Sequence, residues 1–235
     1  MRLTVEEGVR ITLYSTLFQL LKSSLIEVKG VKIYWLGHAG FRIAGEGKSI
    51  YIDPFKIKGG PAADIILVTH SHFDHLSVED IRKISSPKTL LIGPKECEPR
   101  FRQLGLEHKL VKPGVTLDIS GVRVEAVPAY NVGKSFHPKM DGKVGYVVTV
   151  GGVKIYHAGD TDRIPEMASI KPDVSLLPVG GTYTMSVEEA AQAAKDIGVG
   201  IFVPMHYGSI VGGKADAERF RSIVGENAVI IEPEE

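Results

Sequence analysis

The sequence predicts an α+β fold in which two mixed β-sheets pack face to face and helices cover their outer faces. Short apolar runs typical of strands come in groups, and helical segments are inserted between only some of them. No repeat at solenoid periods is visible, and no linker-like stretch divides the chain. The 235 residues suit one domain of generous size with a core of its own.

The first half of this domain is expected to begin with short antiparallel strands separated by glycine turns, at residues 31–36, 41–44 and 49–52. The compact apolar run 64–69, DIILVT, is typical of a buried strand, and residues 89–92 predict another. A short helix is expected at 78–84, because Ser77 is a suitable N-cap and Asp80 lies in the first turn.

The second half repeats this style of strands followed by helices. Strand-like runs occur at residues 117–119, 122–128, 145–150, 153–157, 174–177 and 201–204. A helix is expected from residue 186 to 197, because Ser186 and Glu189 form a capping box and Gly198 can end it. Residues 215–224 predict a final helix.

Residues 1–30 are expected to form a separate amphipathic helical segment in front of the main domain at residues 31–235. The uncharged run 11–21 is far shorter than the roughly 20 residues that span a bilayer, and its leucines follow helical spacing. Glu6 and Glu7 do not fit the basic start of a signal peptide. The segment is expected to pack on its own domain or on a second subunit, which leaves a homo-oligomer open; docking on a membrane surface is the alternative.

Charge content argues against nucleic-acid binding without excluding a local basic patch, and cysteine content limits the kinds of site. Lys plus Arg and Asp plus Glu both number 28, so the chain lacks the basic footprint that drives non-specific nucleic-acid binding. Cys97 is the single cysteine, which rules out an internal disulfide and a cysteine-rich zinc site. We interpret Cys97 as a half-buried structural residue rather than a reactive thiol, and we expect a reducing, cytoplasmic location.

The strongest chemical signal is the segment THSHFDHLS at residues 69–77, which supplies His70, His72, Asp74 and His75. Imidazole and carboxylate groups suit Zn²⁺ and related divalent metals. The segment follows a buried strand and precedes a helix cap, so it is expected on a loop that a rigid scaffold positions. In an extended loop His70 and His72 can point the same way, whereas Asp74 and His75 come where the chain turns. One motif can therefore serve two metals.

Three later residues complete a set of metal-type ligands. His137 lies in a loop, Asp160 follows the strand-like run KIYHAG, and His206 directly follows the run IFVPM. Taken singly, each has an ordinary explanation as a loop, turn or capping residue. His108 and His157 are the only substitutes for His137, and neither fits the order of the motif as well.

These residues carry a resemblance to a known family. The segment HSHFDH resembles the HxHxDH signature of the metallo-β-lactamase superfamily, and the later His137, Asp160 and His206 are similar to its remaining ligands. The resemblance covers roughly residues 31–232. The segments WLGHAGF, IDPF, AGDTD and PMHYG resemble a subgroup of metal-dependent hydrolases that is also similar to ascorbate-6-phosphate lactonase.

The resemblance implies a four-layer αβ/βα sandwich with a binuclear metal site at one edge, between the two sheets. His70, His72 and His137 would hold one metal, and Asp74, His75 and His206 the second, with Asp160 bridging both. The two ions, expected as zinc with Mn²⁺, Ni²⁺ or Fe²⁺ as alternatives, would lie about 3.5–4 Å apart and share a water.

The resemblance also assigns roles around these ligands. Asp53 would lie behind them and accept the free N–H of a metal-bound imidazole. His38 and Tyr207 would face the site, where His38 could donate to a substrate oxygen and Tyr207 could orient one. Without the resemblance, an ordinary turn or packing role explains each of the three equally well.

The expected chemistry is hydrolysis of a small-molecule ester, lactone or phosphodiester by a metal-activated hydroxide, with Asp74 essential. No Ser or Cys nucleophile motif and no phosphate-binding glycine loop competes with this interpretation. A nuclease or phosphodiesterase is the first alternative, and it would use Lys134, Lys139 and Lys143 to bind phosphate. A non-catalytic metal-dependent binding module is the second, and an iron-dependent redox enzyme is a third.

Overall fold

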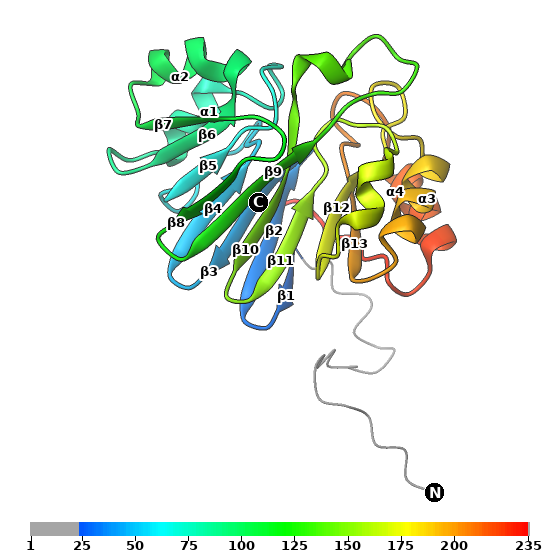
Figure 1. Cartoon of the computed structure of the whole chain (residues 1–235). Helices are drawn as coiled ribbons and strands as arrows, with labels where there is room; N and C mark the ends of the chain where they lie inside the picture. Colours follow the sequence, from blue (N-terminus) through cyan, green and yellow to red (C-terminus); the bar gives the residue numbers. More distant parts are fainter. Residues whose placement is uncertain (1–23, 235) are drawn as a thin grey trace, which may run out of the picture.

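The computed structural model describes residues 24–234, so most of the helical segment expected in residues 1–30 lies outside the described part of the chain. The structure is built from two mixed β-sheets with helices outside them, as Figure 1 shows. The predicted α+β sandwich is therefore confirmed. Among residues 24–234, no helix is long and apolar enough to cross a membrane.

The first sheet has seven strands that follow one another in chain order. They are β1 (Leu25–Val28), β2 (Val31–Gly37), β3 (Gly40–Gly45), β4 (Lys48–Ile52), β5 (Ile65–Leu67), β6 (Leu90–Pro94) and β7 (His108–Val111). The pairs from β1 to β4 are antiparallel, and the pairs from β4 to β7 are parallel. The change at β4 is possible because the longer connections after β4 return each strand to the same direction.

The second sheet has six strands in the order β13-β12-β11-β10-β9-β8. Their bounds are β8 (Thr116–Ile119), β9 (Val122–Pro128), β10 (Val144–Val150), β11 (Val153–His157), β12 (Val174–Pro178) and β13 (Ile201–Met205). The pairs from β8 to β11 are antiparallel, and β11, β12 and β13 run parallel. Both sheets therefore combine an antiparallel part with a parallel part.

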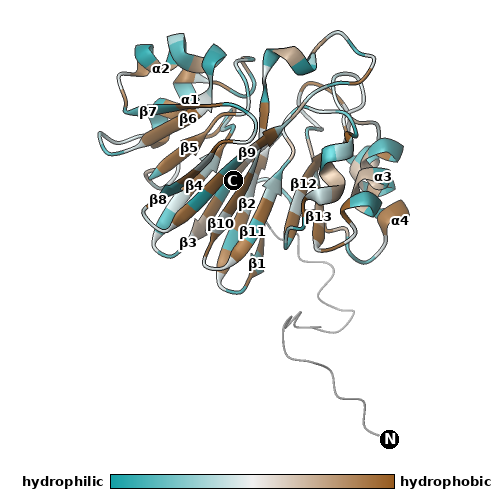
Figure 2. Ribbon diagram, viewed as in Figure 1, coloured by the Kyte–Doolittle hydropathy of each residue, from teal (hydrophilic) through white to brown (hydrophobic). Residues whose placement is uncertain are grey.

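Helices cover the outer faces at opposite sides of the molecule. In Figure 1, α1 (Val78–Ile84) and α2 (Glu98–Leu104) lie beside β6, whereas α3 (Val187–Ile197) and α4 (Lys214–Val224) lie beside β12 and β13. Short 3₁₀ helices occur at Lys95–Cys97, Lys139–Asp141 and Pro165–Ser169. Figure 2 shows hydrophobic residues along the strands of both sheets, whereas the helices combine hydrophilic and hydrophobic residues.

The alternation of side chains along each strand separates two hydrophobic clusters. In β4, Ile50 and Ile52 belong to the large cluster that includes the facing sheet, whereas Tyr51 belongs to the cluster packed with α1 and α2. In β5, Leu67 joins the first cluster and Ile66 the second. Both clusters need apolar side chains, so these central strands are apolar on both faces.

Several predicted elements are confirmed. The helix at 78–84 has the predicted bounds, and the hydroxyl of Ser77 accepts the backbone N–H of Asp80. The helix that follows Ser186 ends at Gly198, and the capping box between Ser186 and Glu189 is formed. These agreements follow from capping, which depends on a few neighbouring residues.

Three elements were not predicted. The strand β1 lies within residues 1–30, the segment expected to be helical, and its Leu25 and Ile26 pair with β2. The helix α2 and the edge strand β7 were missed as well. Their sequences, EPRFRQL and HKLV, are short and polar, and tertiary packing rather than local pattern stabilises them.

Candidate metal centre

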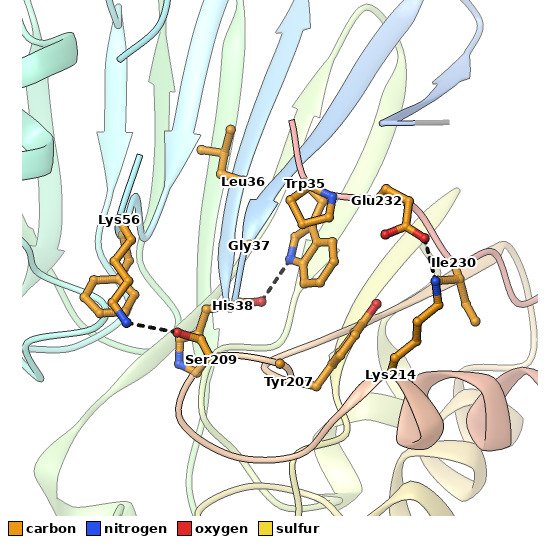
Figure 3. A pocket seen from close by; sticks show the side chains of 13 residues that line it. Trp35, Leu36, Gly37, His38, Lys56, Tyr207, Ser209, Lys214, Ile230 and Glu232 are labelled. Carbon is orange, nitrogen blue, oxygen red and sulfur yellow. Dashed lines mark hydrogen bonds and ion pairs between the residues drawn. The ribbon is translucent and has the colours of Figure 1, made fainter. Parts of the chain in front are cut away.

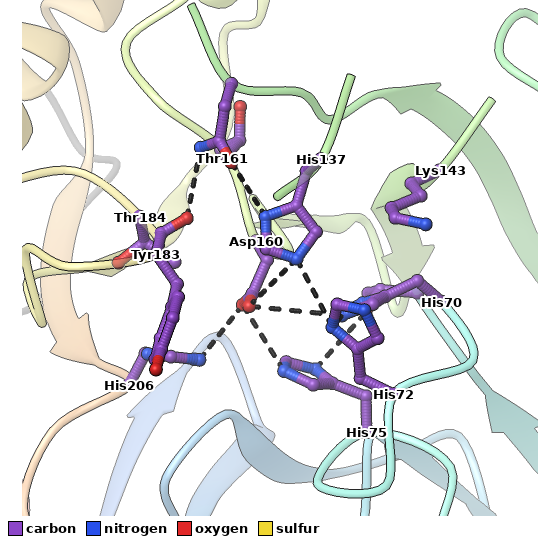
Figure 4. A network of polar contacts seen from close by, with 12 residues as sticks. His70, His72, His75, His137, Lys143, Asp160, Thr161, Tyr183, Thr184 and His206 are labelled. Carbon is purple, nitrogen blue, oxygen red and sulfur yellow. Dashed lines mark hydrogen bonds and ion pairs between the residues drawn. The ribbon is translucent and has the colours of Figure 1, made fainter. Parts of the chain in front are cut away.

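The candidate ligands lie on loops that follow strands. The loop with His70 to His75 follows β5, Asp160 and His206 follow β11 and β13, and His137 lies in the long loop between β9 and β10. Loops at the carboxyl ends of parallel strands in one sheet leave from the same edge. The side chains consequently meet although they come from four parts of the chain, and Figure 4 shows them pointing toward one another.

His70, His72 and His137 form a first group of ring nitrogens that lie within 4.8 Å of one another. Nδ1 of His72 lies 2.9 Å from Nε2 of His70 and 3.4 Å from Nε2 of His137. Nδ1 of His137 donates to Oδ1 of Asn131 at 2.8 Å, and Nδ1 of His70 donates to the Thr69 hydroxyl at 3.0 Å. With these protons on Nδ1, the Nε2 lone pairs of both rings face His72, as in a three-histidine metal site.

A second group consists of His38, Asp74, His75 and His206, again with ligand atoms within 4.8 Å of one another. Oδ2 of Asp74 lies 3.5 Å from Nε2 of His75 and accepts a hydrogen bond from Nε2 of His38 at 2.9 Å. The rings of His38 and His206 are 4.0 Å apart. The structure thus brings together the three residues expected for the second metal and places His38 directly against them.

Asp160 lies between the two groups and faces both. Its Oδ1 is 3.3 Å from Nε2 of His75 and 3.2 Å from Nε2 of His206. Its Oδ2 is 3.9 Å from Nε2 of His70 and 3.6 Å from Nε2 of His137. Figure 4 shows this carboxylate at the centre of the contacts. One oxygen is turned to each group, which is the arrangement expected of a bridging carboxylate.

Asp53 lies behind this cluster and is fully buried. Its Oδ2 accepts Nδ1–H of His75 at 2.7 Å and the Thr69 hydroxyl at 2.6 Å, while its Oδ1 accepts the Thr69 backbone N–H at 2.8 Å. These bonds put the proton of His75 on Nδ1 and direct its Nε2 toward Asp160. A buried carboxylate of this kind fixes the tautomer and orientation of a metal-binding imidazole.

Three residues of the cluster have left-handed backbones. The φ angles of His38, Asp53 and His206 are 51°, 46° and 59°, a region that side chains with a Cβ rarely adopt. The conformation at His38 and His206 is held by hydrogen bonds, since the carbonyl of His38 accepts the backbone N–H of His206 at 2.8 Å and the indole Nε1–H of Trp35 at 3.0 Å. Backbone strain of this kind persists where the surroundings determine the conformation, and it is concentrated at functional sites.

The electrostatics of the cluster combine neutral histidines with an ionised carboxylate. Burial lowers the pKa of His70 well below its usual value and that of His137 to about 4, so both rings are neutral and able to ligate. His75 is also buried, but Asp160 and Asp53 raise its pKa well above the usual range. For Asp160, burial is outweighed by His206 and His75, which hold the pKa of its carboxyl well below normal.

Several buried polar atoms at the centre have no hydrogen-bond partner among the described residues. They include Nε2 of His75, Oδ1 of Asp160 and Nε2 of His206. An unpartnered polar atom in a protein interior costs about 1–3 kcal/mol, and most such atoms are paired. Oδ1 of Asp160 lies 3.3 Å from Nε2 of His75 and 3.2 Å from Nε2 of His206. A divalent cation bound between these three atoms would therefore satisfy all of them. The residues present therefore fit a metal centre.

Comparison with known families identifies one over most of the chain. Residues 32–206 match the family model described as the β-lactamase superfamily domain. The chain belongs to the metallo-β-lactamase superfamily. This metallo-β-lactamase domain is a metal-dependent hydrolase, because its relatives at well over 30% identity carry that description.

Two archaeal relatives illustrate the similarity. The domain is 38% identical over 213 residues to a UPF0173 metal-dependent hydrolase of Thermoplasma acidophilum, which covers 84% of this chain and 92% of the relative. It is 37% identical over 223 residues to a UPF0173 metal-dependent hydrolase of Pyrococcus abyssi, covering 86% and 95%. The resemblance noted in the sequence is therefore confirmed at the level of the family.

Solved structures agree with the fold of this metallo-β-lactamase domain. A crystal structure from Parabacteroides distasonis has a TM-score of 0.77 at 32% identity, covering 89% of this chain and 98% of that one. The metallo hydrolase Igni18 from Ignicoccus hospitalis has a TM-score of 0.74 at 26% identity, covering 87% and 96%. Nearly the whole of each solved chain is matched.

The two histidines considered as substitutes for His137 lie elsewhere in the metallo-β-lactamase domain. His108 begins the edge strand β7 and packs against Phe101. His157 is fully buried in β11, where its Nε2 donates to the carbonyl of Ala39 at 2.8 Å. Neither belongs to the groups of potential ligands found among residues 24–234, whereas His137 lies in the group of His70 and His72.

Tyr207 directly follows His206 in the sequence. It packs on Trp35 with ring centroids 4.8 Å apart and lines a pocket beside His38, shown in Figure 3.

Sequence reasoning missed Asn131 and Thr69, which orient His137 and His70. Thr69 directly precedes the motif and could have been found, whereas no local pattern marks Asn131.

Proposed function

We propose that this hydrolase holds two divalent ions, with zinc as the expected metal, and cleaves an ester or lactone bond of a small molecule. The observation that carries the proposal is the position of Asp160, with one oxygen turned to each group of ligands. The two groups are His70, His72 and His137 on one side and Asp74, His75 and His206 on the other. Ions bound in this way would lower the pKa of a shared water to about 7 and so supply hydroxide at neutral pH.

The chain's own residues would orient the reactants and handle the proton. His38 donates to Oδ2 of Asp74 at 2.9 Å, which fixes that carboxylate in the second group. The pKa of Asp74 is lowered despite its burial, mainly through this hydrogen bond, so the carboxylate is ionised and able to accept a proton from water. His72 is the exposed member of its group, so reactants would enter beside it.

An ester or lactone fits better than a phosphodiester because the three lysines expected to bind phosphate are already paired with carboxylates. Nζ of Lys134 donates to Asp162 at 2.5 Å, and Nζ of Lys139 donates to Glu166 at 2.9 Å. Lys143 is buried, and its Nζ donates to Glu96 at 3.0 Å. A phosphate group would have to displace these partners, which weakens the case for a nuclease.

Metal content and turnover test the proposal together. Elemental analysis of the purified protein should give about two metals per chain, and the His72→Ala variant should retain fewer. The metal-loaded protein should hydrolyse p-nitrophenyl acetate or γ-butyrolactone faster than bis(p-nitrophenyl) phosphate. His108→Ala is the matched control, because His108 lies outside both groups. One metal or none per chain, or a preference for the phosphodiester, would overturn the proposal.

A further inference from the structure

A pocket of about 230 Å³ lies beside His38 (Figure 3). Its walls include the rings of Trp35, Phe55 and Tyr207, all buried within the fold. An apolar cavity of about 150 Å³ is large enough to hold benzene. This pocket therefore has room for a substituted ring or a branched chain of similar size.

The pocket is adjacent to the candidate metal centre. Nε2 of His38 contacts Asp74, while the ring of His38 lies 5.9 Å from that of Phe55 in the pocket wall. Phe55 in turn packs edge-on against Phe73, with centroids 5.8 Å apart. Phe73 stands between His72 and Asp74 in the sequence and is 64% exposed. An apolar surface thus continues from the pocket to the loop that carries the ligands.

One positive charge at the pocket is not neutralised by a carboxylate. Nζ of Lys56 lies 3.3 Å from the hydroxyl of Ser209 and 5.0 Å from the centre of the Phe55 ring. Among residues 24–234, no carboxylate forms an ion pair with Lys56. The second lysine of the pocket, Lys214, differs because it pairs with Glu232 at 2.8 Å. Lys56 is therefore placed to attract an anionic group at the side of the pocket next to Phe55.

We infer that this pocket binds the ring-bearing part of the substrate, so that the enzyme selects aryl-substituted carboxylic esters or lactones, and that Lys56 favours those with an anionic substituent. The inference rests on the proposed function, since it names the substrate class of the same site. Aromatic walls supply the apolar contact area, and Lys56 supplies the charge. A short acetyl ester would leave the pocket empty and gain neither contribution.

The chain contains a built-in probe, because Trp35 is its only tryptophan and lines the pocket. Titration with phenylacetate should change the fluorescence of Trp35 in a saturable way, whereas acetate should not. The titration is repeated after chelator treatment, and the response should persist because the pocket does not use the metal ligands. A response that disappears with the metal would mean binding at the metal centre and would overturn the inference.

Two variants test the pocket and its charge separately. Ser209→Phe, which places a ring at the pocket wall, should weaken phenylacetate binding about tenfold or more. Lys56→Gln should weaken binding of phenylacetate but not of benzyl alcohol, which carries the ring without the charge. The matched control is Ser222→Phe, an exposed position on α4 outside the pocket. Equal affinities for Ser209→Phe and wild type would overturn the inference.

Turnover separates this inference from the proposed function. Methyl phenylacetate should show a higher kcat/KM than methyl acetate, and Ser209→Phe should reduce the ratio between the two. If neither ester is hydrolysed but phenylacetate still binds at Trp35, the proposed function fails while the pocket stands. If both esters are hydrolysed equally well and phenylacetate does not bind, the proposed function survives and the assignment of the pocket fails.

Discussion

Nδ1 of His75 donates to the buried carboxylate of Asp53 at 2.7 Å, and this bond turns the opposite nitrogen of the ring toward Asp160. Asp53→Asn should therefore lower metal affinity about 10- to 100-fold. Asparagine tolerates the left-handed backbone at this position, so the fold should be retained. Metal titration after dialysis against a chelator measures the effect. Asp118→Asn, an exposed carboxylate on β8, is the control, and an unchanged affinity for Asp53→Asn would exclude the orienting role.

Removal of the metal should destabilise the protein. Without a cation, Nε2 of His75, Nε2 of His206 and Oδ1 of Asp160 are buried without partners. A metal present at about one hundred times its dissociation constant adds about 2.7 kcal/mol, which corresponds to about 5–10 °C in Tm for a domain of this size. Calorimetry with and without chelator should show this shift for wild type and for His108→Ala. His206→Ala should show a smaller shift, and an equal one would argue against His206 as a ligand.

Asp74 should be indispensable for turnover. Its carboxylate contacts both His38 and His75, so Asp74→Ala removes a candidate ligand and the proposed proton acceptor together. Hydrolysis should fall by about 10² or more. Elemental analysis should still find metal on the group of His70, His72 and His137, which does not include Asp74. Turnover at the wild-type rate with full metal loading would contradict the proposed mechanism.

Cys97 should be unreactive in the folded protein. It is fully buried beside α2, and burial raises the pKa of its thiol well above the usual value near 9. The folded state therefore keeps the thiol neutral, whereas the unfolded chain releases its proton near pH 9. The stability that this difference contributes is fully present below a pH of about 9 and declines as the pH rises above it. Iodoacetamide at neutral pH should modify Cys97 only in denaturant. Rapid modification of the native protein, followed by mass spectrometry, would disprove this burial.

The sequence determines those features that depend on neighbouring residues. The capping residues Ser77 and Ser186 mark the starts of two helices, and their hydroxyls make the predicted bonds. The segment from His70 to His75 identifies the metal chemistry for the same reason, since its residues lie close together in any conformation of the loop. Alternating apolar residues identify most strands because the side-chain period of a strand is local.

Tertiary structure decides which distant residues meet. His137, Asp160 and His206 have ordinary local surroundings in the sequence, and only the order of strands in the two sheets brings them to one edge. The polar edge strand β7 and the short helix α2 were missed for a related reason, because packing outweighs their weak local preference.

The directions of the side chains next to the ligands could not be predicted from the sequence either. Tyr207, which was expected to face the site, lines the pocket beside His38 and packs on Trp35. The ring of His38 contacts Asp74 through Nε2 and also lines this pocket. Residue types and spacing therefore fix the chemistry available to the site, whereas backbone conformation set by long-range contacts fixes where each group points.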